Sequence, residues 1–344
     1  MNQLKAILLL ILLGISVQAK DYTKRTAVKT FINEMVKKHH FDKAYLNGLF
    51  ANVQFQKRAL GIFNPKYREK KKKTAKKKTY PKHGSWTRYE KNLLSEAKVK
   101  LGSDYMRKHK HIFKKVYQRY GVPPEYVAAI IGVESRYGVK QGDYPVFDVL
   151  TTLAFEKNRR SRYFKSELKK FLVLSKTEKF NPKSIKGSYA GAIGIGQFMP
   201  SAYKHFAVDF DGDGKRTIHQ TPDAIAGIAN YLQKNGWKKW QPVAERVSFG
   251  EKTRYWAKKT GYNRKYPQSQ LKGLKLKYGK SWSYKGPVRL IKLDRYRYDE
   301  LWYGAENFYV ITRYNHSSYY AMAVHQLAQK LKREYKKQHG VYLR

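Results

Sequence analysis

Glu134 is an ionisable side chain at the end of an apolar segment. It follows seven small or aliphatic residues, and in a helix it would share one face with Val127, Ile130 and Ile131. Burial of that face would remove water from the carboxyl group and raise its pKa. A Glu that keeps its proton near neutral pH can act as a general acid. The alternative is a surface Glu that pairs with Arg136 near the helix end.

Alternating acidic residues form a second candidate site. Asp209, Asp211 and Asp213 stand at positions 1, 3 and 5 of a loop that has Gly214 at position 6, as at the start of an EF-hand. Alternate carboxylates on a tight turn converge on one hard cation, and the glycine lets the backbone bend. The pattern therefore predicts a Ca²⁺ site.

The second half of this loop departs from the EF-hand pattern. Lys215 at position 7 would contribute its carbonyl oxygen, but position 12 is Gln220 where an EF-hand has a bidentate Glu. Asp223, three residues on, could supply the missing carboxylate. One fewer bidentate ligand indicates weak binding, with a dissociation constant of about 10⁻⁴–10⁻³ M. An acidic turn without metal is the alternative.

A glycine-rich segment, residues 187–201, is the third candidate. Its glycines, Gly187, Gly191, Gly194 and Gly196, allow close approach of the backbone, and the amide of Gln197 can both donate and accept hydrogen bonds. The segment lacks the lysine of a phosphate-binding loop, so dinucleotide or nucleotide binding is not indicated. A tight loop packed on the core is the alternative.

The elements around these residues are mostly helical by pattern. Residues 20–64 predict two helices, 65–84 are a lysine-rich insertion, and 85–240 predict a helical core that carries all three candidates. Within the core, Pro124 fits a helix start and Gly138 a helix end. Residues 241–307 change texture and include a predicted strand over 288–293, and 308–344 predict a strand over 308–312 followed by a helix. The fold class is mainly α, of the α+β kind.

Charge and the first residues bound the location and the partners. The net charge is +47, from 72 Lys and Arg against 25 Asp and Glu, which favours polyanionic surroundings or reflects a general basic bias. Residues 1–19 read as a cleavable secretory leader, with Lys5, a short apolar stretch and a small-x-small end at Val17 to Ala19. The leader argues against nucleic acid as a partner and predicts an exported protein without a transmembrane span. The absence of Cys excludes disulfides and an anchor on an N-terminal Cys.

Five segments together resemble one family, the lytic murein transglycosylases of type B. They are residues 121–124, 131–138, 187–192, 196–200 and 308–315, in the family's order and spacing. The resemblance runs from about residue 31 to 331 and implies a lysozyme-like core with an accessory helical part, a small β part and an EF-hand-like calcium site. The lysine-rich insertion and the missing Cys depart from the family pattern, and the second departure implies a periplasmic form that is not lipid-anchored.

The resemblance also implies roles residue by residue. Glu134 matches the single catalytic acid and base, and Asp209, Asp211, Asp213, Lys215 and Asp223 match calcium ligands. The residues that match groove positions are Ser188, Gln197, Tyr89, Tyr231, Tyr314, Tyr320, Asn315, Arg159 and Arg160. The implied reaction cleaves the β-1,4 bond between N-acetylmuramic acid and N-acetylglucosamine of peptidoglycan without water and leaves a 1,6-anhydro end. Cell-wall synthesis proteins are further expected partners.

Two other functions remain open at this point. An ordinary glycosidase needs two carboxylates about 5–5.5 Å or about 6.5–9.5 Å apart, and the sequence shows no second acid near Glu134 in a comparable apolar setting. A hydrolytic muramidase on the same fold is nevertheless one alternative. A non-catalytic peptidoglycan-binding protein is the other.

Overall fold

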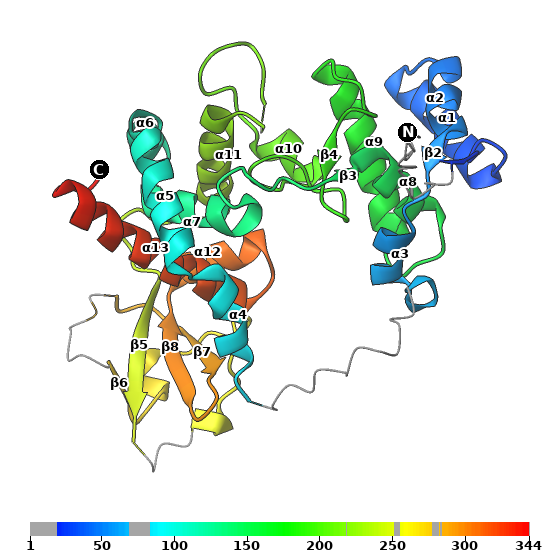
Figure 1. Ribbon diagram of the computed structural model, residues 1–344. Coiled ribbons are helices and arrows are strands. Elements are labelled where there is room, and N and C mark those ends of the chain that lie inside the picture. The colour runs from blue at the N-terminus through cyan, green and yellow to red at the C-terminus, as the bar shows by residue number, and fades with distance from the viewer. Residues whose placement is uncertain are drawn as a thin grey trace, which may run out of the picture. The chain divides into compact units, whose positions relative to one another are not determined.

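The computed structural model describes residues 19–68, 83–217, 219–250, 255–276, 282 and 284–343. The chain divides into two compact units (Figure 1). Unit 1 comprises the residues up to Glu69 together with Phe147–Val173, and unit 2 comprises Lys70–Val146 and Leu174–Arg344. The division does not follow the segments predicted from the sequence, because Phe147–Val173 lies within the predicted core 85–240. The predicted domain boundaries stay a prediction.

Unit 1 is a set of short helices around phenylalanine rings. Phe50 lies 5.9 Å from Phe31, 5.2 Å from Phe147 and 6.1 Å from Phe155, measured between ring centroids. Edge-to-face contacts of this kind stabilise a core beyond the area they bury. The elements are β1 Ala19–Lys20, α1 Thr26–His39, α2 Lys43–Ala51, β2 Val53–Gln54, α3 Lys57–Phe63, η1 Pro65–Tyr67, α8 Val146–Phe155 and α9 Ser161–Thr177.

Unit 2 has a helical part organised around one buried helix. This helix, α7, packs against α5, α6, α11 and α13 (Figure 1). Its residues are buried almost all round, from Pro124 to Gly132, because they are small or aliphatic and let neighbouring helices approach from several sides. The helices are α4 Ser85–Leu93, α5 Glu96–Lys108, α6 Lys110–Tyr120, α7 Pro124–Ser135, α10 Pro200–Phe206, α11 Thr221–Lys234, α12 Glu306–Tyr314 and α13 Ser318–His339.

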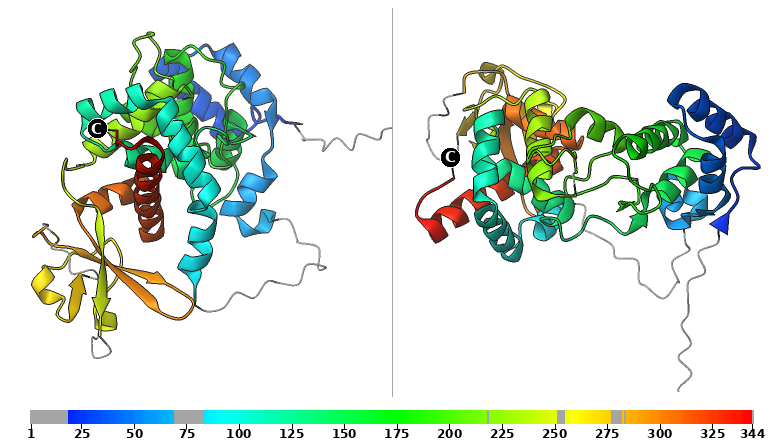
Figure 2. Two further views of the ribbon diagram at one scale, coloured as in Figure 1. Left: turned by 60° about the vertical axis from the view of Figure 1, so that its left-hand side comes forward. Right: turned by 90° about the horizontal axis from the view of Figure 1, so that it is seen from above.

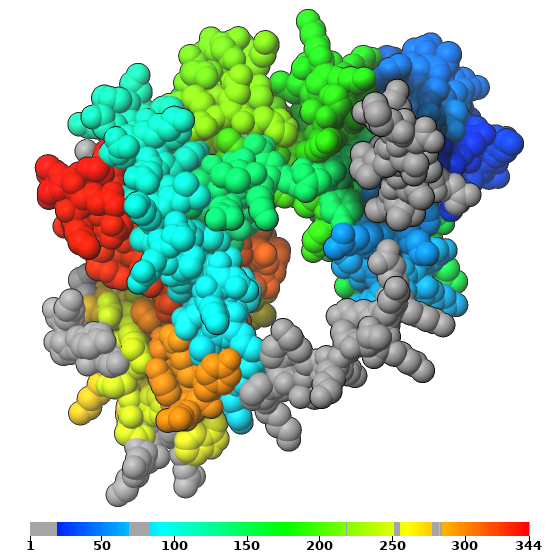
Figure 3. Space-filling model, in the orientation of Figure 1, coloured from blue at the N-terminus to red at the C-terminus, as the bar shows by residue number. Residues whose placement is uncertain are grey.

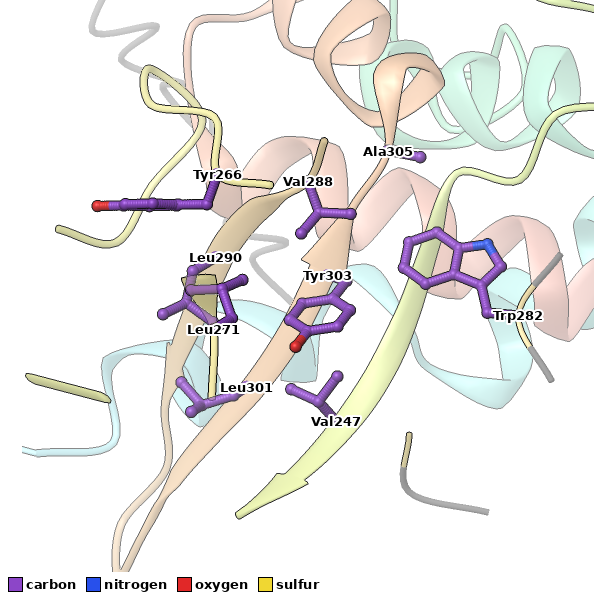
Figure 4. Close-up of a cluster of buried hydrophobic side chains, with 9 residues drawn as sticks. All are labelled: Val247, Tyr266, Leu271, Trp282, Val288, Leu290, Leu301, Tyr303 and Ala305. Atoms are coloured by element: carbon purple, nitrogen blue, oxygen red, sulfur yellow. The ribbon is translucent and has the colours of Figure 1, made fainter. Parts of the chain in front are cut away.

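A four-stranded antiparallel sheet forms the β part of unit 2. The strands are ordered β6-β5-β8-β7, with bounds β5 Ala244–Phe249, β6 Leu274–Leu276, β7 Arg289–Asp294 and β8 Asp299–Gly304. The left-hand view of Figure 2 shows these strands, yellow to orange, as a layer apart from α5 to α7. The sheet buries its own apolar cluster, in which Val247, Leu290 and Leu301 meet the rings of Tyr303 and Trp282 (Figure 4).

Three short elements complete the description of unit 2. They are a two-stranded ribbon of β3 Tyr144–Pro145 and β4 Lys186–Gly187, and the turns η2 Tyr255–Ala257 and η3 Gln268–Gln270. In the space-filling view, the cyan segment of α4 lies against the orange segment of β7 and β8 (Figure 3). Ser85 fixes this contact, because its backbone N–H and its hydroxyl both reach a carboxylate oxygen of Asp294, at 3.3 and 3.0 Å.

The predicted strand over 308–312 is wrong. These residues belong to helix α12, which runs from Glu306 to Tyr314. Aromatic and β-branched side chains favour a strand locally, but in the folded chain Phe308 and Ile311, one helical turn apart, are both fully buried. Tertiary packing therefore overrides the local preference. The predicted strand over 288–293 is confirmed as β7, and the predicted C-terminal helix as α13.

Two predicted segments fall mostly outside the described residues. They are the leader 1–19, of which only Ala19 is described, and the lysine-rich insertion 65–84, of which 69–82 are not. None of the helices in the described part of the chain combines the length and the apolar character needed to cross a membrane.

Candidate active site

Glu134 is the penultimate residue of α7, where the helix ends in a left-handed turn. The backbone φ angles of Arg136, Tyr137 and Gly138 are 51, 59 and 87°. Gly138 adopts such a conformation at no steric cost, but the turn begins two residues before it, at Arg136. Ser135 stabilises the turn, because its hydroxyl accepts a hydrogen bond from the N–H of Gly138 at 3.0 Å. The chain thus turns away directly after Glu134.

The Glu134 carboxyl group is partly exposed yet densely surrounded by protein. Burial raises its pKa from 4.5 to about 7, and the hydroxyl of Tyr320, which donates to Oε1 at 2.6 Å, opposes this rise. Arg136 is exposed, and although the structure describes both residues, no ion pair joins it to Glu134. The prediction of a carboxyl group with a raised pKa is confirmed, and the surface ion pair is not formed.

Three tyrosines of the predicted groove continue from Glu134. The rings of Tyr320 and Tyr314 are stacked, 6.4 Å apart and inclined by 9°, and Tyr231 packs against Tyr314 at 4.8 Å. The Tyr314 hydroxyl donates to the carbonyl oxygen of Gly196 at 2.6 Å. The fold therefore brings side chains of α11, α12 and α13 together beside the carboxyl group. The spacing of these residues along the chain does not predict this arrangement.

The glycine-rich segment approaches this cluster through backbone. A Cβ on Gly196 would lie 3.1 Å from the Tyr314 hydroxyl oxygen, so a side chain there would disturb the contact. Gln197 follows with a left-handed φ of 51°, and its amide donates to the carbonyl oxygens of Gln141 and Gly194 at 2.8 and 2.9 Å. Its carbonyl oxygen can still accept a hydrogen bond.

Ser188 has a local structural role in this segment. Its hydroxyl accepts hydrogen bonds from the N–H groups of Ala190 and Ala192, at 3.3 and 3.0 Å, and so fixes a turn next to β4. Asn315 is exposed and ends α12, directly after Tyr314. Both residues keep their predicted groove roles as predictions.

Tyr89 of α4 is within electrostatic reach of Glu134. Burial raises the pKa of Tyr89, and the charge of Glu134 adds to the rise. The Tyr89 ring is 36% exposed and packs at 5.7 Å against Tyr319, whose hydroxyl is 2.7 Å from that of Ser85. Tyr319 was not predicted from the sequence as a neighbour of Tyr89. Its position next to Tyr320 was the one feature of the sequence that could have indicated it.

Arg159 and Arg160 belong to unit 1, whereas the other predicted groove residues belong to unit 2. The Arg160 guanidinium stacks on the ring of Tyr163, at 4.2 Å from the centroid. Their predicted groove role stays a prediction.

Three of the five predicted calcium ligands converge. Carboxylate oxygens of Asp209, Asp211 and Asp223 all lie within 4.8 Å of one another. Asp223 is fully buried at the start of α11, and the N–H groups of Phe210 and Thr217 hold its two oxygens, each at 2.7 Å. Three carboxylates at this spacing fit a hard cation such as Ca²⁺, which prefers oxygen ligands.

The other two predicted ligands, Asp213 and Lys215, are not part of this group of three carboxylates. The Asp213 carboxylate is outside the group of three and accepts a hydrogen bond from the Lys215 N–H at 2.8 Å. Asp209 also shapes the loop, because its oxygens accept from the N–H groups of Gly212 and Gly214 at 2.7 and 3.0 Å. The substitution of Asp223 for the missing position-12 ligand is consistent with this geometry.

Comparison with known proteins places the chain. Residues 23–329 match the family model described as "Transglycosylase SLT domain". The chain is 37% identical over 309 residues to the membrane-bound lytic murein transglycosylase B of Escherichia coli, which covers 90% of this chain and 83% of the relative.

Two solved structures are similar over most of their length. The Escherichia coli lytic transglycosylase SLT35 in complex with calcium has a TM-score of 0.83 at 35% identity and covers 94% of this chain and 98% of its own. SltB3 from Pseudomonas aeruginosa, in complex with NAG-anhNAM-pentapeptide, has a TM-score of 0.74 at 28% identity and covers 89% and 79%. The mainly α, lysozyme-like fold and the resemblance carried by the five sequence segments are confirmed. The chain therefore belongs to the lytic transglycosylases of the SLT domain family.

Proposed function

We propose that this enzyme cleaves peptidoglycan strands with Glu134 as its only acid and base. The substrate bond is the β-1,4 linkage from N-acetylmuramic acid to N-acetylglucosamine, and the product has a 1,6-anhydro end. The observation that carries the proposal is the state of Glu134, a partly exposed residue whose carboxyl group has a pKa of about 7. Among the described residues, burial and the Tyr320 hydroxyl are the causes of that pKa, and no second carboxylate contributes.

The reaction needs one carboxyl group in two successive roles. Protonated Glu134 donates its proton to the glycosidic oxygen, and the bond from this oxygen to C1 of the muramic acid breaks. The N-acetyl group of the same sugar stabilises the cation that develops at C1. The Glu134 carboxylate then takes the proton of the C6 hydroxyl as the C6 oxygen bonds to C1. The proton returns to Glu134, so the site is ready for another turnover without a water molecule.

A pKa of about 7 suits both roles. A group that titrates near the working pH is an effective donor in one step and an effective acceptor in the next. The hydroxyl of Tyr320 stabilises the carboxylate that exists between the two steps, because its hydrogen bond lowers the Glu134 pKa. Tyr320 is therefore a positioning residue in this scheme.

The remaining predicted groove residues would bind the strand. Tyr89, Tyr231 and Tyr314 offer ring faces to sugars, and the Gln197 carbonyl oxygen can accept from a hydroxyl or amide group. Ser188, Asn315, Arg159 and Arg160 complete the proposed set. The hollow lined by Tyr126 and Trp240 does not include Glu134. The raised pKa of Glu134 and its hydrogen bond with Tyr320 support the proposal that Glu134 is the reacting group.

Calcium would be held by Asp209, Asp211 and Asp223, with Asp213 and the Lys215 carbonyl oxygen as the further proposed ligands. The ion would supply local stability to the loop that leads into α11. The support is the fit of the three carboxylates and the calcium complex of the Escherichia coli relative.

The mass of the products tests the proposal. Purified peptidoglycan sacculi are digested with the enzyme and the soluble fragments are weighed by mass spectrometry. Anhydro ends, one water lighter than reducing ends, are expected. Reducing ends would favour the hydrolytic muramidase, and no release of fragments would favour a non-catalytic binding protein.

The proposed location is the periplasm, reached through the leader at 1–19, and the proposed partners beyond the glycan are cell-wall synthesis proteins. The Escherichia coli relative is named as membrane-bound. Cell fractionation with and without detergent distinguishes a free periplasmic enzyme from one held at a membrane, and a membrane pool released only by detergent would contradict the prediction that the chain carries no lipid anchor.

A further inference from the structure

Two hollows of the unit 2 surface share Trp240, Gln241 and Pro242, and a third hollow reaches Pro242. The first, of about 290 Å³, contains all three residues together with Tyr117 and Tyr126 in its lining. The second, of about 540 Å³, also contains all three, and the third, of about 560 Å³, shares Pro242. We call this region the Trp240 surface. It comprises part of the segment between α11 and β5 together with residues at the N-terminal end of α7.

Trp240 itself is held in an unfavourable state. Its side chain is 70% exposed and its backbone φ is 67°. A bulky residue with positive φ is strained, and an exposed indole gains little from burial. Tyr117 meets the indole edge-to-face at 6.3 Å, and the Lys239 ammonium lies 5.1 Å from the indole centroid. These two contacts help to hold the ring in place while most of it stays exposed. The backbone strain at Trp240 costs stability and the exposed ring returns little of it, so a binding role explains this residue better than a folding role.

The first hollow also has a built polar lining. Glu125 is 3% exposed, accepts a hydrogen bond from the Tyr342 hydroxyl at 2.6 Å and lies 3.6 Å from the Lys332 ammonium. The Gln329 amide donates to the Tyr126 hydroxyl at 3.2 Å. Aromatic faces beside a few fixed polar groups are the usual composition of a ligand site. Sugars match it, because a pyranose ring has an apolar face of C–H groups and a rim of hydroxyls.

This surface is separate from the catalytic groove. Tyr126 and Glu134 stand near opposite ends of α7, and eight residues of helix span about 12 Å along its axis. None of the three hollows contains Glu134 or a groove residue proposed above. One rigid helix therefore carries the reacting group at one end and contributes to the Trp240 surface at the other.

We propose that the Trp240 surface is a second, non-catalytic binding site for N-acetylated glycan strands of peptidoglycan. The proposal rests on the proposed function, since it names the same substrate class. The lining of the second hollow contains Lys238 and Lys285 against one acid, Glu306, and Lys239 lies beside it. The excess of positive charge suits strands that carry acidic peptide stems. Contact at this site keeps the enzyme on insoluble wall between cleavage events.

The test measures binding without cleavage. In a Glu134→Gln background, binding to purified peptidoglycan sacculi is measured by sedimentation for the parent, for Trp240→Gly and for Trp240→Tyr. A dissociation constant about 5- to 20-fold weaker is expected for Trp240→Gly, since central aromatic residues dominate such sites. Trp240→Tyr keeps a ring and should retain most of the binding.

Trp256→Ala is the matched control. Trp256 is also exposed, at 65%, and lies in η2, outside the three hollows. Its loss should leave binding to sacculi unchanged. An equal loss from Trp256→Ala would overturn the proposal in favour of general adhesion of exposed rings, and unchanged binding by Trp240→Gly would overturn it directly. Binding that falls for Lys239→Gln but not for Trp240→Gly would assign the surface to an anionic polymer.

Thermal unfolding separates binding from a structural role. Glycine adopts a φ of 67° without strain, so Trp240→Gly should unfold at the same temperature as the parent or higher. A marked fall in the midpoint, together with unchanged binding, would show that Trp240 serves the fold. The outcome is independent of product chemistry: anhydro products with normal Trp240→Gly binding overturn only this site, and weakened binding without anhydro products overturns only the proposed reaction.

Discussion

Glu134 and Glu300 are both carboxylates enclosed by protein, and the chain treats them in opposite ways. Glu300, on β8, is 4% exposed and receives the Arg295 Nε at 3.0 Å, an Arg246 nitrogen at 3.3 Å and the Trp302 indole N–H at 2.8 Å. Glu134 receives one neutral hydroxyl, from Tyr320. Cations and donors stabilise the first charge, whereas burial destabilises the second.

This difference is informative because cations are abundant. The chain has 72 Lys and Arg and a net charge of +47. A cation next to Glu134 would favour its charged form and lower its pKa, which would remove the proton that the reaction needs. The left-handed turn after Ser135 leaves the nearest arginine in sequence, Arg136, exposed and unpaired with Glu134. The fold thus keeps the positive charge of Arg136 away from the Glu134 carboxyl group.

Replacement of Glu134 by Gln tests the active half of this comparison and should have the largest effect. Turnover should fall by about 10³–10⁴-fold, because the amide neither donates a proton to the glycosidic oxygen nor accepts one from C6. Fragment release from sacculi measures it. Sedimentation with sacculi should still show binding, and residual turnover within about tenfold of the parent would refute the single-acid mechanism.

Replacement of Glu300 by Gln tests the structural half. It leaves Arg246 without its carboxylate and Arg295 with Glu90 alone, and the free energy of unfolding should fall by about 2–3 kcal/mol. Denaturant unfolding measures the loss. Turnover per folded molecule should stay at the parent value, and a specific loss of turnover would mean that the two carboxylates are not separate in role.

The stability of the Glu134→Gln variant relative to the parent should increase with rising pH. The pKa of Glu134 is about 7 in the folded chain and 4.5 in the unfolded chain, so the folded state binds more protons between these values. Glu134 therefore costs stability increasingly from about pH 4.5 to 7, and its removal should stabilise the protein by about 1–3 kcal/mol at pH 8 and by little at pH 4.5. Unfolding curves at both pH values measure the difference; an equal gain at both would contradict the raised pKa.

Tyr320→Phe should sharpen the comparison, because among the described residues Tyr320 is the one side chain that donates a hydrogen bond to the Glu134 carboxyl group. The lost hydrogen bond lowered the pKa of Glu134, so this pKa should rise in the variant. The alkaline limb of the pH–rate profile should move up by the same amount. A limb that stays in place would indicate that another group sets it, and Tyr319→Phe serves as the neighbouring control.

Removal of calcium should have the smallest effect. With a dissociation constant of about 10⁻⁴–10⁻³ M, about 1 mM calcium stabilises the folded state by about 0.4–1.4 kcal/mol. Thermal unfolding with calcium and with chelator measures this shift. Asp209→Asn should abolish the shift, and a calcium response that survives Asp209→Asn would place the ion elsewhere.

The sequence predicted the chemistry of the site better than its assembly. The position of Glu134 after seven apolar residues indicated a general acid, although this segment alone left a surface ion pair with Arg136 equally open. The alternation of Asp209, Asp211 and Asp213 indicated a hard cation. Local residue types carry both signals. The pairing of Tyr320 with Glu134 joins residues 186 positions apart and has no local signature.

The wrong strand and the grouping of residues that the sequence did not predict have the same physical origin. Residues 308–312 combine aromatic and β-branched side chains, and burial on most sides of α12 hides the helical period that would have identified it. The grouping of Phe147–Val173 with the N-terminal residues depends on contacts such as that of Phe147 with Phe50, which composition and periodicity do not reveal. The conformational preferences of neighbouring residues predicted most helices and strands, and packing between residues far apart in the sequence determined the exceptions.

Helix α7 has a polarity that bears on both of its glutamates. The aligned peptide dipoles of a helix place partial positive charge at its N-terminus and partial negative charge at its C-terminus. Glu125 lies in the first turn, where this field favours an anion, and Glu134 lies in the last turn, where the field opposes one. The direction in which the chain runs through α7 thus adds to burial in keeping the proton on Glu134.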